Sequence, residues 1–169
     1  MADAVTSQTI IDGERNCVMK FTNVSDGTGE SAVAKVDVSA LAANSEGTAC
    51  SEVRVMRVSH AIVGMSVQMF LDATSNVLLM ELAESSNGHM DFKDFGGLPN
   101  NAGSGKNGDI LFTTKGHSSG DTYSITLEMV KVYSEYSYNK DIESEKLVIY
   151  NPSYICLLYT SDAADEGLG

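Results

Sequence analysis

The stretch that comes closest to a chemical motif is glycine-rich and spans residues 96–109. Its Gly105-Lys106 pair resembles the end of a phosphate-binding loop, GxxxxGK followed by Ser or Thr. The first glycine of that motif would fall on Asn100, and Asn107 follows the lysine, so no hydroxyl is supplied for a metal. Phosphate binding also needs a helix N-terminus, whereas the next residues are typical of a strand. We therefore predict a flexible, exposed connection between strands.

Histidine and aspartate side chains are candidate metal ligands, and one local cluster contains both. His89 and Asp91 would share one face of a strand, but Asp94 would not follow them cleanly. Metal coordination needs several ligands converging on one point. We therefore expect a solvated face here, with Met90 and Phe92 directed inward.

The other candidate nucleophiles and bases do not form a catalytic pattern. His60 lies between two apolar runs and is interpreted as a turn or rim residue, and His117 lies in a glycine-containing loop. No serine lies in a recognisable nucleophile elbow, and abundant carboxylates on an acidic surface do not define an acid–base pair. The sequence predicts no enzyme and no catalytic, metal or cofactor-binding residues.

Two cysteines, Cys17 and Cys50, precede the last part of the chain. Two cysteines provide neither a disulfide framework nor zinc-ligand spacing. Cys17 alternates with Met19 and Phe21, which favours a buried free thiol, and a Cys17–Cys50 bridge stays open as the alternative. The methionines on apolar strands favour an adaptable core over a binding groove.

Charge limits the classes of partner. The formal net charge is −12 and the pI is near 4.4, which argues against nucleic acid because phosphate contacts need clustered Lys and Arg. The first sixteen residues, MADAVTSQTIIDGERN, lack the basic and apolar regions of a signal peptide. Apolar runs are shorter than a membrane span, so we expect no membrane partner either.

The end of the chain has a different character. Residues 156–166, CLLYTSDAADE, resemble a translated Nextera sequencing adapter, so we interpret 156–169 as an artefact of metagenomic sequencing. Residues 134–155 are rich in Tyr, Asn, Lys and Ile, the residues of AT-rich codons. They are interpreted either as read-through of non-coding DNA or as a genuine extension with a strand at 146–150. This leaves a single domain at 1–133.

Period-two alternation of apolar and polar residues predicts strands through most of that domain. The set that begins at Val63 and the set that ends at Met129 alternate most cleanly, which predicts that Met69 and Leu127 are buried and that Glu128 faces solvent. A short helix is expected at 38–44, with Ser39 as its cap. The apolar sets in strand-like runs are Cys17, Met19, Phe21; Ala32, Ala34, Val36, Val38; Val53, Val55; Val63, Met65, Val67, Met69, Leu71; Leu78, Met80, Leu82; Ile110, Phe112; and Tyr123, Ile125, Leu127, Met129.

Turn residues separate these runs. Residues 26–29, 72–76 and 118–121 combine Asp, Asn, Ser and Gly and are predicted connections. Asn87-Gly88 and Asn107-Gly108 are the strongest two-residue hairpin signals. Many short strands with such turns predict an all-β fold: an antiparallel β-sandwich, jelly-roll-like, in one domain.

Several long sequence segments resemble those of a known protein family. KFTNVSDGTGE, FGGLPNNAGSGKNGDI and GHSSGDTYSI are similar to small virion structural proteins of tailed phages, especially marine phages and cyanophages. The similarity covers about residues 2–131 and ends where the tyrosine-rich stretch begins. One local departure, Ser59 to Ala61, stands where a more aromatic strand is expected.

The resemblance implies a function but transfers no functional residue, because the family has no catalytic motif. It implies a non-enzymatic component of a virion that is assembled in the host cytoplasm, with a head decoration or accessory position. The partners would be other virion proteins and copies of itself, with no nucleic acid and no membrane. The alternative is a carbohydrate-binding β-sandwich on the particle surface. It is ranked second because the domain has no Trp and, before Tyr133, only Tyr123 for stacking.

Overall fold

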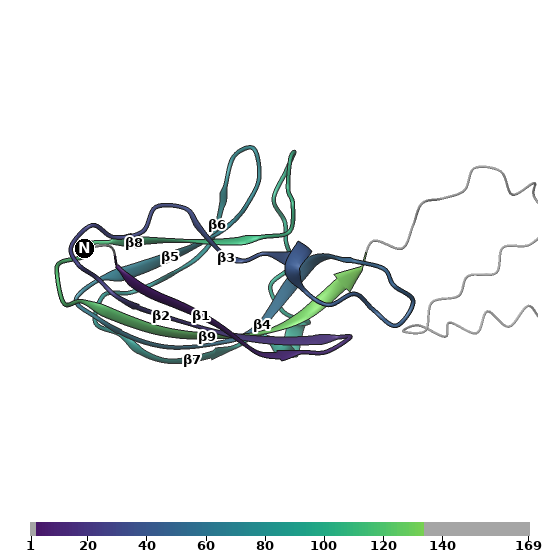
Figure 1. The fold of residues 1–169 in the computed structure, drawn as a ribbon, viewed down its shortest axis with the longest axis horizontal. Helices are drawn as coiled ribbons and strands as arrows, with labels where there is room; N and C mark the ends of the chain where they lie inside the picture. Colours follow the sequence, from purple (N-terminus) through teal and green to yellow (C-terminus); the bar gives the residue numbers. More distant parts are fainter. Residues whose placement is uncertain (1–2, 134–169) are drawn as a thin grey trace, which may run out of the picture. The chain divides into compact units, whose positions relative to one another are not determined.

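In the part of the chain that the structure describes, the strands form two antiparallel sheets (Figure 1). The computed structural model describes residues 3–133; the predictions made for 134–155, for 156–169 and for a strand at 146–150 lie outside the described residues. The elements are β1 (Ala4–Asp12), β2 (Asn16–Val24), β3 (Val33–Val36), η1 (Val38–Ala40), β4 (Cys50–Val63), β5 (Ser66–Leu71), β6 (Val77–Leu82), β7 (Asn87–Asp91), η2 (Lys93–Phe95), β8 (Ile110–Lys115) and β9 (Thr122–Tyr133), where η denotes a short 3-10 helix.

Strand order defines the architecture. The five-stranded sheet has the order β1-β2-β9-β4-β7, and the four-stranded sheet has the order β3-β8-β5-β6. Without β1, the two orders are those of an eight-stranded jelly roll, in which two Greek keys fold into facing sheets. The sequence-based prediction of an all-β, jelly-roll-like sandwich is confirmed. β1 is an additional strand that pairs with β2 at the edge of the larger sheet.

The core fills the space between the sheets. Cys17, Phe21, Met69 and Leu127 are fully buried, as alternation predicts, because every second residue of a strand faces the opposite sheet. Aromatic rings connect the two sheets: Phe112 of β8 packs edge-on against Phe21 of β2, at 5.4 Å between ring centroids, and against Tyr123 of β9, at 6.1 Å. Edge-to-face geometry is the favoured arrangement of such rings.

One run that the sequence presents as a single strand is a hairpin. β4 ends at Val63, which is 61 % exposed, and β5 begins at Ser66, so the predicted strand through Val63 and Met65 is wrong. Gly64 between them has φ +81°, and a Cβ there would lie 2.0 Å from Oδ1 of Asp121. Only glycine fits this turn. Periodicity fails here because Val63, Met65 and Val67 keep a spacing of two in the sequence, whereas the turn changes which residues face inward. Ile62 is buried before the turn and Met65 after it, and Val63 is exposed.

The Asn87-Gly88 turn prediction is also wrong, because both residues lie in β7. The chain reverses just before them, at a turn in which Ser85 has φ +52°. Asn107-Gly108 lies in the long connection to β8, with φ +95° at Gly108, rather than in a tight hairpin. The predicted connections at 26–29, 72–76 and 118–121 do lie between strands.

Bulges explain the remaining differences. In β4 the pairing with β9 shifts between Val55 and Arg57, so that Val55 and Val58 are both buried, and His60 lies within the strand rather than at a turn. In β3 the pairing shifts between Ala34 and Val36, and Ala34 is exposed although its alternation predicted otherwise.

The predicted helix at 38–44 is shorter than expected and has a different cap. Only η1 forms there, from Val38 to Ala40. The cap is Asp37, not Ser39: the Asp37 carboxylate accepts a hydrogen bond of 2.9 Å from the backbone N–H of Ser39. Aspartate is as good a cap as serine, and Asp37 is the residue immediately before η1, whereas Ser39 lies within it.

Candidate functional site

The glycine-rich connection from Gly96 to Asp109 is held more closely than the sequence predicts. Leu98 exchanges two backbone hydrogen bonds with Val55, of 2.9 and 3.2 Å. Asn100 and Ala102 are buried, and the Asn100 side chain accepts a hydrogen bond of 3.0 Å from the Ala102 N–H. These contacts make the connection part of the packed domain rather than a freely exposed loop.

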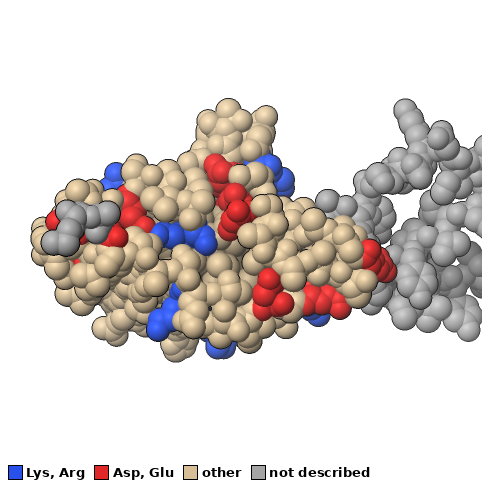
Figure 2. Space-filling model, in the orientation of Figure 1, with Lys and Arg blue, Asp and Glu red and all other residues tan. Residues whose placement is uncertain are grey.

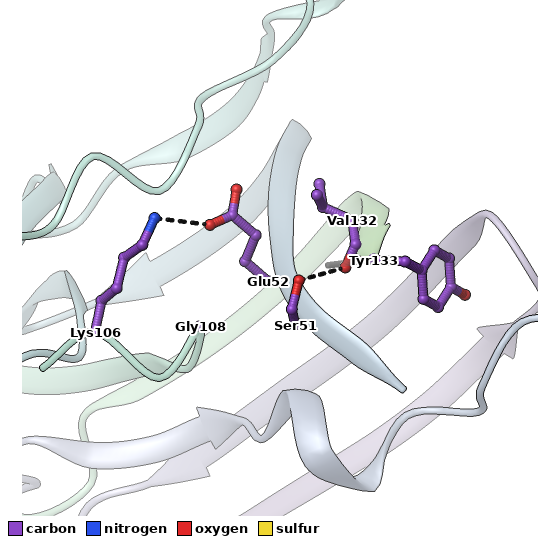
Figure 3. Close-up of a pocket in the computed structure, with 6 residues that line it drawn as sticks. All are labelled: Ser51, Glu52, Lys106, Gly108, Val132 and Tyr133. Atoms are coloured by element: carbon purple, nitrogen blue, oxygen red, sulfur yellow. Dashed lines mark hydrogen bonds and ion pairs between the residues drawn. The ribbon is translucent and has the colours of Figure 1, made fainter. Parts of the chain in front are cut away.

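Its second half closes one side of a shallow pocket of about 400 Å³ (Figure 3), lined by Ser51, Glu52, Lys106, Gly108, Val132 and Tyr133. Gly108 has φ +95°, and a Cβ there would lie 2.2 Å from the Ser51 carbonyl oxygen. The glycine is therefore required for close approach of two backbones. A glycine cradle around phosphate uses the same property for a different purpose.

The polar groups of this pocket are paired with one another. Lys106 Nζ lies 3.1 Å from Glu52 Oε2, which neutralises the lysine that a phosphate would need. The Ser51 hydroxyl donates a 3.0 Å hydrogen bond to the Val132 carbonyl, so that its proton is not directed to a base. Figure 3 shows Tyr133 pointing away from the Lys106–Glu52 pair. This arrangement fits a surface depression that is held together by its own polar contacts.

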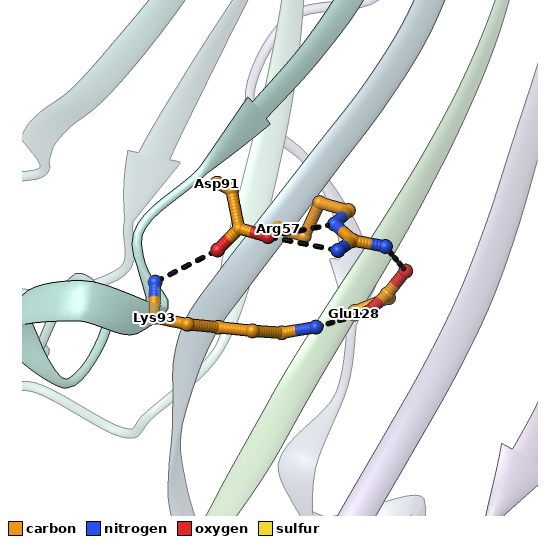
Figure 4. A network of polar contacts seen from close by, with 4 residues as sticks. All are labelled: Arg57, Asp91, Lys93 and Glu128. Carbon is orange, nitrogen blue, oxygen red and sulfur yellow. Dashed lines mark hydrogen bonds and ion pairs between the residues drawn. The ribbon is translucent and has the colours of Figure 1, made fainter.

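One member of the His–Asp cluster, Asp91, belongs to an ion-pair network on the surface (Figure 4). The Asp91 carboxylate accepts hydrogen bonds from Arg57 Nε at 3.1 Å and Nη2 at 2.8 Å, and Arg57 Nη1 reaches Glu128 Oε1 at 3.0 Å. Lys93 Nζ lies 3.2 Å from the second Glu128 oxygen. The Lys93 backbone N–H and then the Arg57 guanidinium lower the pKa of Asp91. The network connects β7, β4 and β9 on the outer face of the larger sheet.

Other members of that cluster lie apart from the network. His89 is exposed on the edge strand β7, and Asp94 is exposed on η2, while Met90 and Phe92 pack against the core as predicted. Within residues 3–133, no three His, Cys, Asp or Glu side chains are grouped closely enough to hold a metal ion. In the same residues, no helix is long and apolar enough to cross a membrane.

One serine motif needs the structure for its interpretation. Residues 116–120, GHSSG, match the pattern G-x-S-x-G of nucleophile elbows, which requires a strand-to-helix turn. Here the segment connects β8 to β9, two strands, and the Ser118 N–H bonds to the Asp121 carboxylate at 2.6 Å. The His117 ring lies under Gly29, where a Cβ would approach the ring to 2.2 Å. The serine thus stands in a hairpin connection, as its flanking strands indicate.

The thiols of Cys17 and Cys50 are free and buried. Burial raises the pKa of Cys17 to about 11 and raises that of Cys50 as well. Cys17 is opposite Met129 on β9, and Cys50 is opposite Tyr133, four residues further along the same strand. That separation corresponds to ~13 Å along the strand, which is well beyond disulfide range. The free-thiol interpretation is confirmed for Cys17.

A buried polar cluster was missed by the sequence analysis. Glu30 accepts a hydrogen bond from Tyr123 Oη at 2.6 Å and forms an ion pair with Lys35, and all three side chains are buried. Burial, and then the contact with Glu30, raises the pKa of Tyr123. Alternation had placed Lys35 on the outward face of its strand, and the bulge in β3 is the reason for the difference.

Comparison with known proteins gave no assignment: no family model, no curated protein and no solved structure matches this chain.

Proposed function

We propose that this protein is a non-enzymatic structural component of a tailed-phage virion, in a head-decoration or accessory position. It would act by association with other virion proteins and with copies of itself, during assembly in the host cytoplasm. The observation that carries the proposal is the jelly-roll strand order of β2 to β9, which is the architecture of many viral capsid domains. The resemblance of several sequence segments to phage virion proteins supports the same proposal.

Fold alone does not define function, so the side chains of the candidate sites also matter. The charged groups in the pocket and in the network on β4, β7 and β9 are paired within the domain. Figure 2 shows acidic side chains in separate patches, with largely uncharged surface between them. An acidic surface keeps an abundant particle protein soluble before assembly and limits non-specific association.

A carbohydrate-binding domain is the second candidate, because lectins also use jelly rolls. Tyr123 is 2 % exposed and cannot stack on a sugar, which weakens the candidate. Phe95 on η2 favours it, since its ring is 66 % exposed and lies 5.9 Å from the ring of Phe92. Exposed aromatic faces are the usual platform for such stacking.

Co-sedimentation of the purified protein with phage heads that lack it tests the first candidate. We expect saturable binding, with the bound protein visible on the particle by electron microscopy. A glycan array tests the second candidate, with Phe95→Ala as the matched variant. Absence of head binding together with glycan retention that Phe95→Ala abolishes would replace the virion proposal with the carbohydrate-binding one.

A further inference from the structure

We propose that the free edge of β1 pairs with β1 of a second copy in antiparallel orientation, joining two five-stranded sheets into one continuous sheet. This inference deepens the proposed function and rests on it for its biological purpose, since it names the surface through which copies of the chain associate.

β1 lies outside the jelly roll. It precedes the eight strands of that fold and pairs with β2 along one edge, and all nine of its residues are exposed. Figure 1 shows it at the border of the larger sheet. An edge strand presents a row of backbone N–H and C=O groups that can pair with another strand. β1 therefore contributes little to the core. Its regular part, from Ala4 to Thr9 before the register shift between Thr9 and Ile11, offers a template for pairing.

Apolar exposure is concentrated at this edge. Val5, Ile10 and Ile11 of β1 are 39, 50 and 50 % exposed, and Val24 at the end of β2 is 50 % exposed. These are four of the eight large hydrophobic side chains that are exposed in the described residues. Val5 and Val24 lie at one end of β1 and Ile10 and Ile11 at the other. Exposed apolar side chains along a free sheet edge are typical of a strand that acquires a partner.

The other sheet edges carry features that oppose pairing. β7 has five residues and ends in the ion-paired Asp91, and β3 has four residues with a bulge. β6 carries Glu81, whose carboxylate accepts hydrogen bonds from Ser66 and Gln68, and its pairing with β5 is bulged. Short length, bulges and charges are the known means of protecting an edge. From Ala4 to Ile11, β1 has no charged residue.

Charge selects a second copy as the occupant. In a protein with net charge −12, most surfaces would repel the same surface of a second copy, because both are negatively charged. The uncharged β1 would not. The acidic residues at its ends are already engaged: Asp3 accepts hydrogen bonds from Asn23 at 3.1 Å and from the Asp26 N–H at 2.9 Å, and Asp12 forms an ion pair with Lys131. Antiparallel self-pairing also closes with two-fold symmetry, as in most homodimers.

The test measures self-association of the full chain by sedimentation over a wide concentration range. Ser7→Lys/Gln8→Lys places two exposed lysines at the centre of β1, where two-fold pairing brings like charges together. Asn87→Lys/His89→Lys adds the same two lysines to exposed positions on β7, the opposite edge of the same sheet. We expect a dimer whose dissociation constant rises at least tenfold in the β1 variant and is unchanged in the β7 variant.

A monomer at every concentration, a β1 variant as dimeric as the wild type, or equal weakening in both variants would overturn the proposal. Because the lysines could perturb folding, Gln8→Cys provides an independent measurement: mild oxidation should link two chains through it, and His89→Cys should give no such link. A lack of selective linkage would also contradict the β1 contact. Head binding by a strictly monomeric protein would refute this contact and leave the proposed virion function intact. A β1 dimer that does not bind heads would support the contact and contradict the virion function.

Discussion

Replacing Glu30 with glutamine should be among the most damaging single changes in the described domain. Glu30 lies just before β3 of the smaller sheet, and its carboxylate contacts Lys35 of β3 and Tyr123 of β9 in the larger sheet. The side chains of Glu30 and Lys35 are 4 and 2 % exposed. The cluster is therefore a charged connection between the two sheets, away from water. Lys35 Nζ also lies 6.0 Å from the centroid of the Tyr123 ring.

The size of the stability loss depends on the Lys35 charge that stays buried after the substitution. Glutamine keeps the shape of Glu30 and can still accept from Tyr123, but the Lys35 ammonium loses its counter-charge. Removal of one member of a buried ion pair costs about 3–5 kcal/mol because the other charge stays buried without compensation. Domains of this size are stable by about 5–15 kcal/mol in total, so the loss is a large fraction of the free energy of unfolding.

Lys35→Met tests whether the loss arises from the unpaired charge. Glu30→Gln/Lys35→Met removes both charges and keeps side chains of similar length, and replacing a whole buried pair is often neutral or stabilising. We therefore expect the double variant to be more stable than Glu30→Gln, with a coupling energy of at least about 1 kcal/mol in the double-mutant cycle.

Urea denaturation followed by far-ultraviolet circular dichroism measures these differences. With a slope of about 2 kcal/mol per molar urea, a loss of about 4 kcal/mol lowers the midpoint by about 2 M. A decrease of less than about 1 kcal/mol for Glu30→Gln, the median for exposed pairs, would show that water reaches the pair. A double variant no more stable than Glu30→Gln would show that the unpaired lysine is not the cause.

Three further outcomes are expected. Leu127→Ala should lower the free energy of unfolding by about 2–5 kcal/mol, because apolar burial is lost and a cavity is left. Glu128→Ala should lower it by at most about 1 kcal/mol, because the ion pairs of Glu128 are partly exposed. Equal losses for the two variants in urea denaturation would contradict the assignment of which β9 residues face the core. Since burial raises the pKa of Cys17 to about 11, peptide mapping after treatment with a thiol reagent at pH 8 should find Cys17 modified only once the protein unfolds, and rapid modification of the native state would refute this. A chain that ends at Tyr133 should melt within a degree or two of the full chain by calorimetry, a difference of a few tenths of a kcal/mol, and a larger decrease would show that the tail contributes to the core.

Alternation predicted the interior where the strands are regular. β2 and β9 pair residue for residue from Asn16 opposite Val130 to Val24 opposite Thr122, without a bulge. A period of two then determines which side chains face the other sheet, and the burial of Phe21 and Leu127 follows from the sequence alone. The fold class could be predicted for the same reason, because several such runs with turn residues between them specify a sandwich.

Bulges and tight turns limited the rest. At the bulge in β3 two consecutive residues, Lys35 and Val36, face the interior, so that Lys35, which alternation placed in solvent, is buried beside Glu30. The hairpin at Gly64 was hidden because apolar residues keep a spacing of two through it, although Val63 is exposed and Ile62 and Met65 are buried. Pairing partners are properties of the tertiary structure, and no local pattern in the sequence reports them.

The glycine-rich connection illustrates the same limit for sites. Its composition predicted mobility, but Gly97 and Gly108 allow two backbones to approach closely: a Cβ at Gly97 would lie 3.0 Å from the Val55 carbonyl oxygen, and one at Gly108 would lie 2.2 Å from that of Ser51. Both of those oxygens belong to β4. Glycine thus serves packing here rather than ligand binding or flexibility, and only the neighbouring strand distinguishes these uses.

The free edge of β1 differs from the candidate sites in the way its polar groups are paired. Charges in the described domain that lie near a potential site are paired with one another, as Lys106 is with Glu52 and Arg57 with Asp91, whereas the backbone groups along the outer edge of β1 have no such cover. A strand that adds nothing to the core still costs conformational entropy to order. Pairing of that strand with a second copy would offset the cost, which is why β1 is the part of this fold whose presence is best explained by association.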